Sequence, residues 1–228
     1  MQFDPFRFIL DRLNDHGYSA YFVGGCVRDF FMNKHLSDVD IATSAPQKRV
    51  EQLFEDLDMD LSASYFGVVT LNKPVKCQIA TYRSEGSYHN HRYPRNITFV
   101  EDVTLDAYRR DFTVNALYLD KDMNLYDPFD GMDDLKKRIL RCIGTPAVRL
   151  NEDALRILRA IRFSITLGFT MDPELLKTCI ELSPLLIYLK EDTIELERRK
   201  LMSNPLNKDQ KDKLEHYRNI IPTLSKYF

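Results

Sequence analysis

Two short segments decide how this chain folds: Tyr21-Phe-Val-Gly-Gly-Cys-Val-Arg-Asp29 and Asp38-Val-Asp-Ile-Ala-Thr43. The first predicts an apolar strand that ends at a Gly-Gly turn and continues as a short helix beginning near Cys26. The second predicts another strand. Side chains alternate between the two faces of a strand, so Asp38 and Asp40 are expected to point the same way.

The paired aspartates and paired glycines together predict a site for a metal-bound polyphosphate. Carboxylates on one face repel each other unless a cation lies between them, and oxygen ligands suit Mg²⁺. Gly24 and Gly25 allow backbone N–H groups to approach an anion, which the positive end of the following helix also favours. Alone, each feature is more often an acidic strand end or an ordinary turn. Their ordered combination favours phosphoryl or nucleotidyl transfer.

The composition is that of an ordinary globular protein, with 228 residues, 44% hydrophobic and 29% charged. The formal net charge of -2 means that RNA binding would need a local basic patch. Four scattered cysteines without C-x-x-C spacing argue against a disulfide framework or a zinc site and fit a reducing cytoplasm. We see no signal peptide and no membrane-spanning run, and therefore expect a cytoplasmic protein without membrane association.

Alternating short strands and helices up to about residue 145 predict a mixed α+β first domain, residues 1–145. Within it, residues 113–119 are expected to be extended. The polar segment 84–95, which contains Gly86 and Pro94, predicts a mobile loop. Helical spacing then predicts an all-helical second domain, residues 146–228, with helices over 147–168, 173–182 and 185–202.

The segment Asn151-Glu-Asp-Ala-Leu-Arg-Ile-Leu-Arg159 begins with a residue typical of a helix N-cap. Glu152, Arg156 and Arg159 share one helical face at spacings of four and three, which permits ion pairs along the helix. Taken alone, this pattern is typical of a solvated helix. The packing side is predicted to contain Leu155, Leu158, Ile161 and Ile165.

The same segment has a sharper interpretation, because an aspartate and an arginine match the hydrogen-bonding edges of two bases. A carboxylate accepts from an amino group, and an arginine donates to a ring nitrogen. Cytosine and adenine offer that pair of groups, whereas uracil and guanine present the reverse order. Asp153 and Arg156 could therefore accept CTP and ATP without a template, since a wrong base leaves buried polar groups unpaired.

Four ordered motifs between residues 18 and 170 resemble the class II tRNA nucleotidyltransferase and poly(A) polymerase family, and within it the CCA-adding branch. They are Gly24-Gly-Cys-Val-Arg-Asp29 with Asp38-x-Asp40, Arg109-Arg-Asp-Phe-Thr113, Asp127-Pro-Phe-Asp-Gly131, and Glu152-Asp-x-x-Arg156. The resemblance implies a polymerase-β-like nucleotidyltransferase head, a mixed β-sheet with helices, followed by an all-α neck. It also implies addition of C and A, from CTP and ATP, to the acceptor end of tRNA.

The resemblance implies a role for each matching residue. Asp38 and Asp40 would be the catalytic carboxylates and would hold two Mg²⁺ ions. The implied nucleotide-binding residues are Gly24, Gly25 and Arg28 for the triphosphate, Arg110 and Asp111 for the sugar and phosphates, and Asp153, Arg156 and Arg159 for the base.

Two departures from the family pattern keep alternatives open. Family members usually carry a glutamate where this chain has Gln78, and an amide brings no charge to a metal. Only about sixty residues follow Phe169, whereas CCA-adding enzymes of this class continue into body and tail domains. The alternatives are a relative that adds only CC, only A or a poly(A) tail, and a non-catalytic RNA- or nucleotide-binding module. The oligomeric state stays unknown.

Overall fold

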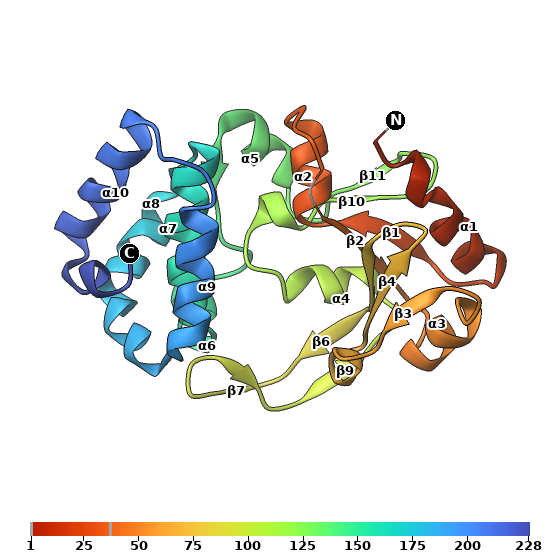
Figure 1. Ribbon diagram of the computed structural model, residues 1–228. Coiled ribbons are helices and arrows are strands. Elements are labelled where there is room, and N and C mark those ends of the chain that lie inside the picture. The colour runs from red at the N-terminus through yellow and green to blue at the C-terminus, as the bar shows by residue number, and fades with distance from the viewer. Residues whose placement is uncertain (1, 37) are drawn as a thin grey trace. The chain divides into compact units, whose positions relative to one another are not determined.

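The computed structural model describes residues 2–36 and 38–228, which form two compact units (Figure 1). The first unit consists of Met1–Gly86 and Asn96–Met132, and the second of Ser87–Arg95 and Asp133–Phe228. The chain therefore enters the second unit twice, first for a short hairpin and then for its C-terminal part. The domain boundary expected between residues 145 and 146 stays a prediction, because a compact unit of contacts is not by itself a domain.

A mixed sheet forms the centre of the first unit, and among the described residues it has seven strands. Only β2 and β5 run parallel; the other neighbouring pairs are antiparallel. In spatial order the strands are β11 (Leu125–Tyr126), β10 (Tyr118–Leu119), β1 (Ala20–Val23), β2 (Val39–Thr43), β5 (Cys77–Thr81), β4 (Val68–Lys73) and β3 (Asp58–Asp60).

The two faces of this sheet differ in chemistry. Directly opposite residues on neighbouring strands share a face. Phe22, Ile41 and Ile79 lie side by side in register and are fully buried, so this row belongs to the hydrophobic core. The adjacent row, on the other face, contains Asp40 beside Gln78. The period-two alternation therefore places the predicted carboxylate on the face opposite this core row.

Helices of the first unit pack around the sheet (Figure 1). They are η1 (Asp4–Phe6), α1 (Arg7–Asp15), α2 (Gly25–Phe31), α3 (Gln47–Leu53), η2 (Ser64–Phe66), α4 (Val103–Tyr108) and η3 (Thr113–Asn115), and α5 (Gly131–Lys137) crosses the boundary between the units. The extended conformation expected over 113–119 is wrong for its first half, which is the 3₁₀ turn η3. Asp111 causes this turn in part, because its Oδ1 accepts hydrogen bonds from Phe112 N and Asn115 Nδ2.

The loop expected over residues 84–95 is wrong in part, because this segment contributes strands to two short ladders; its mobility stays a prediction. In the first unit β6 (Arg83–Glu85) pairs with β9 (Ile97–Phe99), and in the second β7 (Tyr88–His89) pairs with β8 (Tyr93–Pro94). The strands are two or three residues long, shorter than the run over which an alternating apolar pattern can be recognised. Sequence periodicity therefore had nothing to detect.

The second unit is mainly helical, but it also contains two short β ladders. Besides β7–β8, the strand β12 (Ile139–Leu140) pairs in parallel with β13 (Thr170–Met171). The helices are α6 (Pro146–Glu152), α7 (Leu155–Leu167), α8 (Pro173–Leu182), η4 (Ser183–Tyr188), α9 (Glu191–Leu201), α10 (Lys208–Ile220) and η5 (Pro222–Lys226). Within the described residues, no helix is long and apolar enough to cross a membrane.

The single helix expected over 147–168 is interrupted at Asp153, which has an extended backbone with φ -136° and ψ 98°. Asn151 is therefore inside α6 and does not cap a helix. Asp153 Oδ1 accepts a hydrogen bond from Leu155 N at 3.0 Å, and Ala154 N donates to the His91 carbonyl at 2.8 Å. These two acceptors satisfy N–H groups that a continuous helix would pair internally.

The predicted packing side of α7 is confirmed, since Leu155, Leu158, Ile161 and Ile165 are all buried. The helix expected over 185–202 is instead divided into η4 and α9, and Leu189 between them has an extended backbone. Pro184 lies in the first turn of η4, a position that favours the start of a helical segment. Residues 183–188 therefore form a separate short 3₁₀ helix.

Candidate active site

Asp40 and the Gly-Gly turn lie next to each other in the first unit. Asp40 on β2 is paired in register with Val23, the residue that precedes Gly24. A Cβ atom placed on Gly24 would lie 4.0 Å from Asp40 Oδ2. Asp38 lies two residues before Asp40 and is exposed. The structure therefore brings Asp40 and the predicted phosphate turn together, and Asp38 is close enough for its charge to act on Asp40.

Gly24 has a backbone conformation that other residues rarely adopt, with φ 78° and ψ -133°. This conformation turns the chain from β1 into α2. A Cβ on Gly24 would also lie 3.4 Å from Arg110 Nη1, and one on Gly25 would lie 3.6 Å from Arg28 Nη2. The two glycines thus leave the backbone of the turn close to two guanidinium groups, a combination suited to an anion.

The surroundings of Asp40 destabilise its charged form. Burial raises the pKa of Asp40, Arg110 lowers it, and the like charge of Asp38 raises it further, so that the pKa lies above the ordinary value. A cation held by both carboxylates would remove the repulsion and favour the charged form of each.

Gln78 lies directly beside Asp40, as the family resemblance led us to expect for the third ligand position. The two residues are paired in register on the parallel strands β2 and β5, and Gln78 is exposed. Within residues 2–36 and 38–228, no cluster of three or more His, Cys, Asp or Glu side chains suits a metal. The available oxygen donors are therefore two carboxylates and one amide carbonyl, which is a hard-ligand set suited to Mg²⁺.

Arg28 and Asp111 are linked through Asn115, which the sequence reasoning missed. Arg28 Nη1 donates to Asn115 Oδ1 at 2.6 Å, and Asn115 Nδ2 donates to Asp111 Oδ1 at 3.1 Å. Arg28 also forms an ion pair with Asp29 at 2.9 Å. All three linked side chains are buried. Asn115 could have been suspected, because it is a polar residue directly before the apolar run 116–119.

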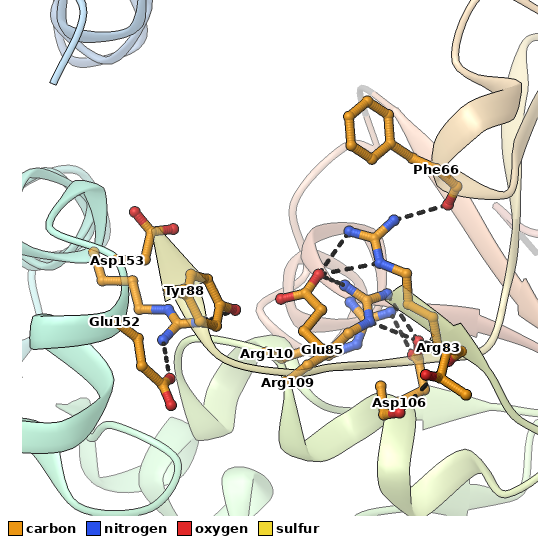
Figure 2. A network of polar contacts seen from close by, with 12 residues as sticks. Phe66, Arg83, Glu85, Tyr88, Asp106, Arg109, Arg110, Glu152 and Asp153 are labelled. Atoms are coloured by element: carbon orange, nitrogen blue, oxygen red, sulfur yellow. Dashed lines mark hydrogen bonds and ion pairs between the residues drawn. The ribbon is translucent and has the colours of Figure 1, made fainter. Parts of the chain in front are cut away.

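Arg110 is held by two further residues that sequence reasoning missed, Asp106 and Tyr118; Figure 2 labels Arg110 and Asp106. Its Nη2 lies 3.2 Å from Asp106 Oδ2, and its Nε donates to the Tyr118 hydroxyl at 2.8 Å. Burial raises the pKa of Asp106, but Arg110 and Arg109 outweigh burial and bring it to about 2. Asp106 is therefore a charged, fully buried anchor.

The predicted base-selecting residues Asp153 and Arg156 are neighbours in the second unit and are both buried. Arg156 Nη1 donates to the Arg149 carbonyl at 2.8 Å and to Glu152 Oε2 at 3.2 Å. Its Nη2 lies 3.3 Å from the Tyr88 hydroxyl. Figure 2 shows Tyr88, Glu152 and Asp153 in this region. The ion pair between Glu152 and Arg156 follows the helical spacing even though the helix ends between them.

Asp153 is engaged by the β7–β8 hairpin, a contact that the sequence did not predict. Arg92 Nη1 donates to Asp153 Oδ2 at 3.0 Å. Burial raises the pKa of Asp153, and Arg92 and Arg156 offset this only in part. The charged form of the Asp153 carboxylate is therefore stabilised by each additional hydrogen-bond donor, and the amino group of a base could serve as one.

Arg159 lies close enough to Asp153 for its charge to oppose the rise that burial causes in the pKa of that carboxyl, and it also contacts α9. Its Nη1 lies 4.0 Å from Glu197 Oε1 on α9, and Glu197 Oε2 accepts from Arg162 Nε at 2.6 Å. Burial raises the pKa of Glu197, but Arg162 and the other nearby cations outweigh it and leave the pKa below its ordinary value. Arg159 thus acts on Asp153 by its charge and pairs with Glu197 on α9, and its expected role of steadying the base-selecting pair stays a prediction.

Comparison with known proteins places this geometry in a family. The model of the poly(A) polymerase head domain matches residues 20–141. The CCA-adding enzyme of Geobacillus sp. (strain WCH70) is 41% identical over 197 residues, which are 86% of this chain and 48% of that protein. The CCA-adding enzyme of Lactobacillus johnsonii is 45% identical over 166 residues, 73% of this chain and 42% of that protein.

The crystal structure of the Bacillus stearothermophilus CCA-adding enzyme in complex with CTP matches with a TM-score of 0.83 and 33% identity, covering 99% of this chain and 52% of that one. The chain thus spans about half the length of the curated relatives that it matches. The expected α+β class and polymerase-β-like head are confirmed. The chain belongs to the poly(A) polymerase head domain family, a family of generally metal-dependent nucleotidyltransferases.

Proposed function

We propose that the chain catalyses template-independent addition of C and A, from CTP and ATP, to the acceptor end of tRNA. The observation that carries the proposal is the arrangement of Asp38 and Asp40 beside the Gly24 turn and the Arg110 guanidinium. Similarity to CCA-adding enzymes over most of this chain supports the choice of substrates. The proposed setting of the reaction is the cytoplasm.

Mg²⁺ is the proposed metal, and Asp38, Asp40 and the Gln78 carbonyl are the proposed oxygen donors. When bound, the metal would supply Lewis-acid stabilisation of negative charge during nucleotidyl transfer. The donor set fits, since Asp38 is close enough for its charge to act on Asp40, and the charged form of Asp40 is destabilised by burial and by that like charge. Gln78 is the weakest member, because an amide carbonyl is neutral.

The remaining residues of the first unit bind and orient the nucleotide in this proposal. Gly24 and Gly25 let the triphosphate approach the backbone of the turn, and Arg28 and Arg110 offset its negative charge. Asp111 engages the sugar, while its hydrogen bonds to Asn115 and Phe112 hold the carboxylate in place. These groups order the reacting atoms, which is a large part of catalysis in phosphoryl transfer.

In the second unit, Asp153 and Arg156 select the base in this proposal. Asp153 accepts a hydrogen bond from the amino group of cytosine or adenine, and Arg156 donates to the neighbouring ring nitrogen. Arg159 steadies this pair. Both selecting side chains are buried, so uracil or guanine, which presents the reverse order of donor and acceptor, would place like groups against each other where water cannot compensate.

The test is incorporation into a tRNA that ends before CCA, supplied with CTP, ATP or both in the presence of Mg²⁺. We expect three added nucleotides with both and two with CTP alone. The Asp38→Ala, Asp40→Ala variant should lose at least about 1,000-fold in rate, because no carboxylate then remains for the metal. Equal, negligible incorporation by wild type and variant would favour the non-catalytic binding module.

Product length separates the remaining alternatives in the same reaction. Two nucleotides with both substrates present indicate a CC-adding enzyme. A single A added only to tRNA ending in CC indicates an A-adding enzyme. Unlimited extension with ATP alone indicates a poly(A) polymerase and contradicts the proposal.

A further inference from the structure

The buried Asp106 carboxylate in the first unit accepts hydrogen bonds on both of its oxygens. Oδ1 accepts from Arg109 Nε at 2.9 Å and from Arg83 N at 3.3 Å. Oδ2 accepts from the Tyr118 hydroxyl at 2.8 Å and from Arg110 Nη2 at 3.2 Å. Figure 2 shows Arg109 and Arg110 beside Asp106. With both oxygens paired, Asp106 stays charged despite complete burial.

Tyr118 completes a closed triangle with Asp106 and Arg110. Its hydroxyl donates to Asp106 Oδ2 and accepts from Arg110 Nε at 2.8 Å, so both partners of Tyr118 are also partners of each other. Burial lowers the pKa of Arg110, but Tyr118 and Asp106 outweigh burial and raise it above the ordinary value. One edge of the guanidinium, formed by Nε and Nη2, is therefore fixed by hydrogen bonds to Tyr118 and Asp106.

The other side of the same guanidinium lies at the Gly-Gly turn. Arg110 Nη1 lies 3.4 Å from the position that a Cβ on Gly24 would occupy, and the positive charge also acts on Asp40. The guanidinium is planar, so holding Nε and Nη2 determines the direction of Nη1 as well. A side chain with several rotatable bonds is thereby presented to the turn in one orientation.

From this geometry we infer that Asp106 and Tyr118 are positioning residues, which orient Arg110 for the triphosphate of the incoming nucleotide. The inference rests on the proposed function for the identity of the ligand, a nucleoside triphosphate. Neither residue is expected to touch the nucleotide itself. Because they order the Arg110 side chain before the nucleotide arrives, binding loses less side-chain conformational entropy.

The test is binding of inorganic triphosphate, measured by its displacement of a fluorescent ATP analogue from the full chain. Tyr118→Phe retains the ring and removes only the hydroxyl that holds Arg110 and Asp106. We expect its dissociation constant for triphosphate to rise about tenfold, the effect of one lost hydrogen bond to a charged group. Asp106→Asn is expected to have a larger effect, but it also removes the buried counter-charge of two arginines and risks unfolding.

Tyr126→Phe is the matched control. The ring centroid of Tyr126 lies 6.1 Å from that of Tyr118, so both belong to one aromatic cluster. The Tyr126 hydroxyl, however, forms a hydrogen bond with Thr104 Oγ1 at 2.7 Å. We expect its triphosphate affinity to change less than twofold. An unchanged affinity in Tyr118→Phe, or an equal loss in both variants, would overturn the inference.

A double-mutant cycle separates positioning from a general structural effect. In an Arg110→Ala background, removal of the Tyr118 hydroxyl should no longer weaken triphosphate binding, because its effect passes through Arg110. An equal effect in both backgrounds contradicts the inference. Binding needs no catalysis, so a wild-type chain that binds triphosphate but incorporates nothing would sink the proposed function and leave the positioning role intact. A wild-type chain that binds no triphosphate would overturn the positioning role.

Discussion

The predicted site residues of the two units are held in place by different kinds of structure. In the first unit Asp40 lies on a strand between Val23 and Gln78, and backbone hydrogen bonds fix that register. In the second unit Asp153 lies at a break between helices, where the carboxylate pairs with Arg92 through side chains alone. Replacing Arg92 alone would remove the ion pair of Asp153. The position of Asp40 on its strand survives any side-chain change that preserves the sheet.

This difference separates the two tasks in the proposed function. Metal binding needs carboxylates at one fixed spacing, which a sheet provides. Selection between cytosine and adenine needs donors and acceptors that adapt to two bases of different size. A carboxylate with one oxygen on a backbone N–H and the other in an exchangeable side-chain ion pair suits that second task better than a residue fixed on a strand. Three substitutions test the comparison.

The largest effect is expected for Gly24→Ala, which attacks the backbone of the first-unit site. A side chain at φ 78° is strained, and the Cβ would approach Arg110 Nη1 and Asp40 Oδ2. We expect about a 100-fold loss of kcat/KM for CTP addition. Gly17→Ala is the control, because Gly17 also has a positive φ of 82° but a Cβ there meets nothing within 4 Å. Equal losses in activity would mean that strain on folding, not the site, is responsible.

The next effect is expected for Asp153→Ala, which removes the acceptor for the base amino group. We expect the preference for CTP over UTP, measured as a ratio of kcat/KM, to fall by about 10- to 100-fold, because discrimination depends on a buried polar partner. Affinity for tRNA should change little. Unchanged nucleotide choice would refute the base-selecting role.

Asp172→Ala is the matched control for that substitution. Asp172 makes the same two kinds of contact as Asp153: one oxygen accepts from the Glu174 N–H at the start of α8, and the other pairs with Arg141 Nη1 at 2.8 Å. Both substitutions therefore cost a helix-start hydrogen bond and an ion pair, about 1 kcal/mol or somewhat more. Only the Asp153 substitution should alter nucleotide choice.

The first-unit site was predictable from sequence because strand spacing is local. Asp38-x-Asp40 needed only a period of two, and the glycines that precede it identified the turn. The partners of Arg110 were less visible. Asp106 is four residues away on α4, but nothing in an isolated aspartate indicates that it is fully buried. Tyr118 resembled an ordinary strand residue, and only the fold places its hydroxyl between Asp106 and Arg110.

The second-unit site was predicted less well because its backbone depends on distant partners. Residues 151–159 contain no proline or glycine, so the sequence favoured a continuous helix. The break at Asp153 is supported by the carbonyl of His91, which accepts from Ala154 N. His91, whose ring also contacts the Asn151 carbonyl sixty residues later in the chain, lies in a hairpin whose strands are too short to predict. Local propensity cannot register such a contact.

The smallest effect is expected for Gln78→Glu, which restores the charge that the family pattern usually carries at this position. Gln78 is exposed and in register with Asp40, so a glutamate would fit without repacking and would add a third oxygen anion. We expect the Mg²⁺ concentration for half-maximal activity to fall about three- to tenfold, with little change in nucleotide choice. Gln52→Glu, on the exposed part of α3, adds the same charge elsewhere in the first unit and should leave the Mg²⁺ dependence unchanged. A raised Mg²⁺ requirement in Gln78→Glu would mean that the strand register does not determine the metal site, and that the contrast between the two units fails where it should be strongest.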